Sequence, residues 1–128
     1  MSGAGDILCA ASAAALAQVQ GLNRVSDGPP MRAAFPYATV EAGPETDWSH
    51  KSGRGRELRL RLTIRDGGER PARLRALAQA AEAAIEGIDG ALDGWRVVTP
   101  VFLRAQILRE PGGGWAAAID YRARMLKA

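Results

Sequence analysis

The sequence predicts an α+β fold, in which a mainly antiparallel four-stranded sheet carries two helices packed on one face. Residues 57–65 alternate between apolar and polar side chains, and residues 71–88 repeat apolar side chains at helical spacing. A Pro-Gly-Gly-Gly turn at 111–114 separates two β-prone runs. The expected element order is helix, strand, strand, helix, strand, strand, in one domain of residues 1–128, because a chain of this length can bury its own core.

The N-terminal segment predicts an amphipathic helix over residues 6–20, which Gly21 ends. It has neither the basic start of a signal peptide nor the about 18 consecutive apolar residues of a membrane span, so no membrane partner is expected. Residues 22–34 contain the Pro29-Pro30 pair and predict a surface connection, with a possible short strand at Arg24-Val25.

The next segment predicts a strand followed by a long loop. Residues 36–42 are β-prone and end at Gly43-Pro44. Residues 43–56 are rich in glycine, serine and basic side chains, which indicates a flexible loop. Loops of this length in compact domains are more often functional than decorative.

The strand over 57–65 and the helix that follows Pro71 are expected to share the core. The alternation of the strand and the 3.6-residue period of the helix each give one apolar face. The predicted core residues are Leu58, Leu60, Leu62, Ile64, Leu74, Leu77 and Ile85.

The C-terminal part predicts a hairpin. Residues 95–110 are β-rich but interrupted by Pro100, so they form one bent strand or two short ones. After the turn at 111–114, apolar and polar residues alternate from Trp115 to Arg124.

A row of arginines defines the candidate interaction site. Arg59, Arg61 and Arg65 lie two or four residues apart, so they project to the sheet face that the helices leave uncovered. Such a face meets solvent, pairs with acids or contacts a partner. Together with the predicted loop, the candidate interface with a partner protein comprises Trp48, Lys51, Arg54, Arg56, Arg59, Arg61 and Arg65. The candidate acidic partners are Glu41, Glu45, Asp47 and Glu110.

No combination of residues predicts catalysis, a metal site or a cofactor. The only cysteine, Cys9, falls within the first predicted helix and is expected to pack there, as in a protein of a reducing compartment. The only histidine, His50, lies in the predicted loop without a nucleophile beside it. The glycine-rich stretches lack the strand and helix context of a phosphate-binding loop. The chain is therefore expected not to be an enzyme.

Several short motifs, in this order and spacing, resemble the small tail-terminator or tail-completion proteins of long-tailed phages and gene transfer agents. They are Phe35-Pro36-Tyr37, Thr46-Asp47-Trp48, Gly53-x-Gly55-Arg56-Glu57, Asp93-Gly94-Trp95 and the run from Arg104 to Arg109-Glu110-Pro111.

The resemblance implies a subunit of a hexameric ring that caps the tail tube, stops its polymerisation and joins it to the head connector. Its partners would be other copies of the chain, the tail tube protein and the head–tail connector protein, with DNA passing through the ring as a further candidate. The protein would be cytoplasmic during assembly and then part of a virion tail.

Two other functions stay open at this level. A net charge of +3 permits a small basic nucleic-acid-binding domain, although the basic residues form no dense stripe. An enzyme or accessory subunit with a non-obvious site is the other alternative.

Overall fold

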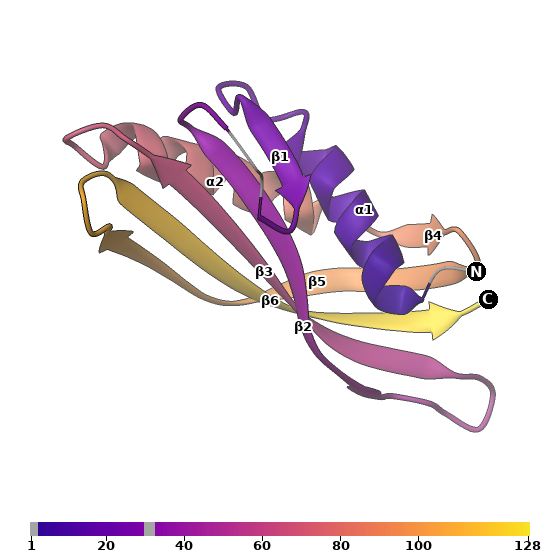
Figure 1. Cartoon of the computed structure of the whole chain (residues 1–128). Helices are drawn as coiled ribbons and strands as arrows, with labels where there is room; N and C mark the ends of the chain where they lie inside the picture. Colours follow the sequence, from indigo (N-terminus) through magenta and orange to yellow (C-terminus); the bar gives the residue numbers. More distant parts are fainter. Residues whose placement is uncertain (1–2, 30–32) are drawn as a thin grey trace.

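The computed structural model describes residues 3–29 and 33–128, so Pro30 of the predicted Pro29-Pro30 pair lies outside the described residues. Within these residues, two helices and six strands follow one another (Figure 1). They are α1 (Ala4–Leu16), β1 (Arg24–Asp27), β2 (Tyr37–Asp47), β3 (Gly55–Asp66), α2 (Ala72–Glu86), β4 (Gly90–Leu92), β5 (Trp95–Arg109) and β6 (Trp115–Lys127).

The sheet has six strands in the order β1-β2-β3-β6-β5-β4, so the expected mainly antiparallel four-stranded sheet is wrong. It is also mixed, because β1 pairs with β2 in parallel while the other pairs are antiparallel. The two additional strands, β1 and β4, contain only four and three residues, too few for a clear pattern of alternation. β1 includes the possible short strand at Arg24-Val25, whereas β4 was not expected. Figure 1 shows that the sheet curls strongly, like part of a barrel.

Both helices pack against the same side of this sheet, where the core lies (Figure 1). All seven predicted core residues of β3 and α2 are buried, which confirms the two periodicities. The helix α1 ends at Leu16, earlier than expected, and the turn that follows reaches Gly21, whose φ of 100° favours glycine. Within the described residues, no helix is long and apolar enough to cross a membrane.

The predicted loop over 43–56 is wrong, because most of it belongs to a β-hairpin. Strand β2 continues to Asp47 and β3 begins at Gly55, so only residues 48–54 form the connection. The Trp48 N–H donates to the Gly55 carbonyl at 2.8 Å, which closes the hairpin. Pro44 does not interrupt β2 because it lies at an irregularity of the pairing with β3, between Ala42 and Glu45, where a strand tolerates proline.

The C-terminal hairpin is present as predicted, and β5 is one strand. Its pairing with β6 shifts between Val98 and Val101, around Pro100, and again between Phe102 and Arg104. Strand β6 lies between β5 and β3 and so joins the two halves of the sheet.

Candidate interaction surface

The sheet face opposite the helices, which we call the outer face, carries the predicted arginine row. Leu58, Leu60, Leu62 and Ile64 point to the helices, so the residues between them point away. Arg59, Arg61 and Arg65 consequently share the outer face.

Two of these three arginines are paired within the chain. Arg61 donates to both carboxylate oxygens of Asp120, with Nε–Oδ1 at 2.7 Å and a terminal nitrogen to Oδ2 at 3.1 Å. The Arg65 Nε donates to Glu110 Oε1 at 2.9 Å. Arg59 has no carboxylate within ion-pair distance among residues 3–29 and 33–128, so its guanidinium is available to a partner.

Asp120 is the centre of this polar arrangement. Its side chain is 19% exposed, and Arg104 approaches it from β5 at 3.9 Å. The hydrogen bonds from Arg61 lower the pKa of Asp120 more than its partial burial raises it, and the charges of Arg61 and Arg104 lower it further. The carboxylate is therefore ionised at neutral pH and fixes the Arg61 guanidinium.

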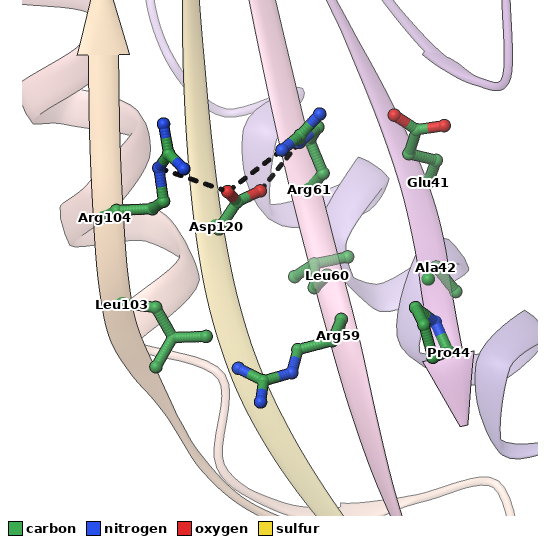
Figure 2. A pocket seen from close by; sticks show the side chains of 10 residues that line it. Glu41, Ala42, Pro44, Arg59, Leu60, Arg61, Leu103, Arg104 and Asp120 are labelled. Carbon is green, nitrogen blue, oxygen red and sulfur yellow. Dashed lines mark hydrogen bonds and ion pairs between the residues drawn. The ribbon is translucent and has the colours of Figure 1, made fainter. Parts of the chain in front are cut away.

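A groove of about 470 Å³ crosses the outer face above this ion pair (Figure 2). One side is formed by Glu41 and Pro44 of β2, and the other by Leu103 and Arg104 of β5. Arg59 lies at the floor between them. The groove thus places the Arg59 guanidinium between two apolar side chains, Pro44 and Leu103, while Glu41 and Arg104 add one charge of each sign to its sides. This combination suits an acidic and partly apolar segment of another protein.

The predicted site residues near the hairpin do not join this groove. The Trp48 ring is covered by the Arg124 guanidinium at 4.9 Å, so the predicted apolar anchor is half-buried within its own chain. Arg56 points to the helix side and pairs with Glu45 at 3.3 Å. Lys51 and Arg54 are exposed at the hairpin tip.

Sequence reasoning missed an exposed apolar stripe on β5. Its large side chains are 38–49% exposed, although the run was interpreted as an ordinary strand. They are Val98, Val101, Phe102, Leu103 and Leu108. The signal was present, because residues 101–108 place apolar side chains on both sides of a strand instead of alternating.

The residues that could take part in catalysis or metal binding lie apart from one another. Cys9 is buried in α1, and this burial, more than nearby Asp27 and Asp6, raises the pKa of its thiol to about 11. A thiol with that pKa is a poor nucleophile at neutral pH. His50 packs edge-on against Trp48, with ring centroids 4.5 Å apart. In the described ranges, no group of three or more His, Cys, Asp or Glu is arranged to hold a metal ion.

Comparison with known proteins identifies the family. The family model of tail completion protein gp17 matches residues 7–126 of the chain. A chain from the virion of a native gene transfer agent particle is 30% identical, with a TM-score of 0.77, and the match covers 98% of this chain and 99% of that one. The gp17 protein of bacteriophage SPP1 is 19% identical, with a TM-score of 0.59 over 96% of this chain and 89% of that one, and so shares the fold. Among curated proteins, the chain has no match. The resemblance indicated by the sequence motifs is confirmed: the chain belongs to the tail completion protein gp17 family and is a structural tail protein of a phage-like particle.

Proposed function

We propose that the chain is the subunit of a hexameric ring that caps the tail tube, stops its polymerisation and joins it to the head connector. The observation that carries this proposal is the match to a chain of an assembled gene transfer agent virion over nearly the whole length of both chains. A ring subunit needs surfaces for its partners and no reactive groups. The buried Cys9 and the separation of His50 from it are compatible with that role.

The outer face is proposed to contact a neighbouring subunit or the tail tube protein. Support comes from Arg59, whose guanidinium lies in the groove between Leu103 and Pro44 and has no ion-pair partner among the residues that the structure describes. The paired arginines Arg61 and Arg65 contribute less, because a second carboxylate would compete with Asp120 and Glu110. The same pairing gives little support to a nucleic-acid-binding domain, since phosphate binding needs uncompensated basic groups.

Deleting the gene in a particle-producing strain tests the function. Tails examined by electron microscopy should be overlong or without heads, and the wild-type gene supplied in trans should restore them. Tails of normal length joined to heads in the deletion strain would overturn the proposal.

A single variant then tests the outer face. Arg59→Glu should leave the chain folded, since no intramolecular ion pair is lost, but should give the deletion phenotype because the groove would repel an acidic partner. Arg75→Glu, on the exposed side of α2, is the matched control and should assemble normally. If the Arg59 variant assembles as well as the Arg75 variant, the outer face is not the contact surface.

A further inference from the structure

The sheet has two long strand segments with a free edge, one on each side. β4 pairs only with Trp95–Val97, so Val101–Arg109 of β5 has β6 on one side and, among residues 3–29 and 33–128, no strand on the other. β1 pairs only with Tyr37–Val40, so within the described part of the chain Glu41–Asp47 of β2 has β3 as its one neighbouring strand. We call these segments the β5 edge and the β2 edge. Unpaired edges of this length are templates for pairing with another chain.

The two edges carry opposite charges. The β5 edge contains Arg104 and Arg109 and no acidic residue. The β2 edge contains Glu41, Glu45 and Asp47 and no basic residue, although Glu45 also pairs with Arg56 of its own chain. Two β5 edges or two β2 edges would therefore repel each other, whereas a β5 edge and a β2 edge attract.

The β5 edge also exposes apolar side chains that an isolated subunit leaves in water. Val101, Phe102, Leu103 and Leu108 are each 39–49% exposed. Exposed apolar side chains grouped on one strand mark a surface that is covered in an assembly. Polar or charged side chains line the β2 edge except at Ala42, Gly43 and Pro44, and Pro44 withholds one N–H donor from the pairing.

The directions of the strands fit a ring. Three successive antiparallel pairings, β2 with β3, β3 with β6 and β6 with β5, make β2 and β5 of one sheet antiparallel. When copies are related by rotation about an axis along the strands, each copy keeps its strand directions. The β5 edge of one copy then meets the β2 edge of the next in the antiparallel sense, and the contact is heterologous, as ring closure requires.

We infer that neighbouring subunits join by antiparallel pairing of the β5 edge of one copy with the β2 edge of the next. This inference rests on the proposed ring and names the surfaces that close it. The occupant of each edge is a second copy of this chain, selected by complementary charge.

Charge exchange tests the pairing. The β5-edge variant carries Arg104→Glu and Arg109→Glu, and the β2-edge variant carries Glu41→Lys and Glu45→Lys. In either variant alone the two edges have the same charge, so in the deletion strain each should reduce normal-length, headed tails at least tenfold. When both variants are expressed together, each edge meets an opposite charge on the other variant, and tails should return through rings of alternating subunits. One chain with all four substitutions should also restore them.

The controls separate this inference from the ring itself. Arg70→Glu with Arg75→Glu changes two exposed charges at and before the start of α2 and should assemble normally. Normal tails with each edge variant alone, or failure of both rescue combinations, would overturn the edge pairing while leaving the proposed function intact. Normal tails in the deletion strain itself would instead overturn the proposed function.

A cross-link keeps the inference testable if an edge variant fails to fold. In a Cys9→Ser chain, Gln106→Cys on β5 and Thr46→Cys on β2 place single thiols on the two edges, both on the outer face. A short bismaleimide applied to assembled particles should link chains that carry both cysteines into a ladder reaching six copies. Chains with either cysteine alone should stay unlinked. A ladder no stronger than in the single-cysteine particles would overturn the pairing.

Discussion

Whether Tyr121→Phe raises or lowers the free energy of unfolding depends on whether the Tyr121 hydroxyl forms a hydrogen bond. Its side chain is fully buried on β6, directly after Asp120, and its hydroxyl has no hydrogen-bond partner among the described residues. Burial raises the pKa of this hydroxyl strongly, so it stays neutral. A buried polar group without a partner costs about 1–3 kcal/mol, and Tyr121→Phe removes that cost. The contact of the ring with Phe102, at 6.0 Å between centroids, is retained.

The expected increase in the free energy of unfolding is the difference between two contributions, the relieved burial of the hydroxyl and the void that its removal leaves. The substitution leaves a void of roughly 15 Å³, which at about 24 cal/mol per Å³ costs near 0.4 kcal/mol. The free energy of unfolding should therefore rise by about 0.5–2.5 kcal/mol, equivalent to a Tm increase of roughly 2–10 °C in a chain of this size.

Denaturant titration and calorimetry measure this change directly. Tyr37→Phe is the matched control, because Tyr37 is only half-buried and its hydroxyl is not among the buried, unpartnered ones. That control should change the free energy of unfolding by less than about 0.5 kcal/mol. A loss of 1 kcal/mol or more in the Tyr121 variant would show that its hydroxyl is hydrogen-bonded and would refute the reasoning.

Two further predictions concern the sheet. Leu60→Ala should lower the free energy of unfolding by about 2–5 kcal/mol, because Leu60 is fully buried between the sheet and the helices; near-neutral stability in a denaturant titration would contradict the burial. The second prediction concerns stability at low pH. Arg61 lowers the pKa of Asp120 in the folded chain below its value in the unfolded chain. The ion pair therefore stabilises the fold above the unfolded pKa, and this contribution is lost as the pH falls through the folded pKa. Asp120→Asn should lower the free energy of unfolding by no more than about 1 kcal/mol at pH 7, since Arg61 is half-exposed. Below about pH 4 the variant should lose less stability than the wild-type chain does. If the free energy of unfolding falls with pH equally in both chains, Asp120 is not responsible for the acid dependence.

The elements with strong periodicity could be predicted from the sequence. The alternation through β3 correctly separated Leu60, which faces the helices, from Arg59 and Arg61, which do not. The period of α2 likewise placed Leu74 and Ile85 in the core. These patterns depend on local backbone geometry alone, so they can be interpreted without knowing which strands pair.

The features that depend on pairing could not be predicted. The partner of Arg61 is Asp120, 59 residues away, which sequence reasoning did not offer. Of the acids that it offered, Glu110 does pair with an arginine of the row, Arg65. Which residues stand opposite each other is set by the register between β3 and β6, and no local pattern encodes it. The β5 stripe is a different case, because its non-alternating apolar residues could have been recognised in the sequence. Only the extent of its exposure depends on pairing, since it is set by how far β4 extends along β5.

The position of β6 in the sheet also constrains how the protein is made. β6 is the last strand of the sheet along the chain, yet it lies between β3 and β5, and its pairing joins Gly55 to Leu126. During synthesis, β1, β2 and β3 leave the ribosome well before β6 does, and until then β3 has no neighbour on its second side. Because domains fold as units and unpaired strands aggregate, the nascent chain depends on rapid completion of its last strand. A chain that ends between Arg109 and Trp115 would therefore contain β1, β2 and β3 together with β4 and β5, but would lack the strand that joins them.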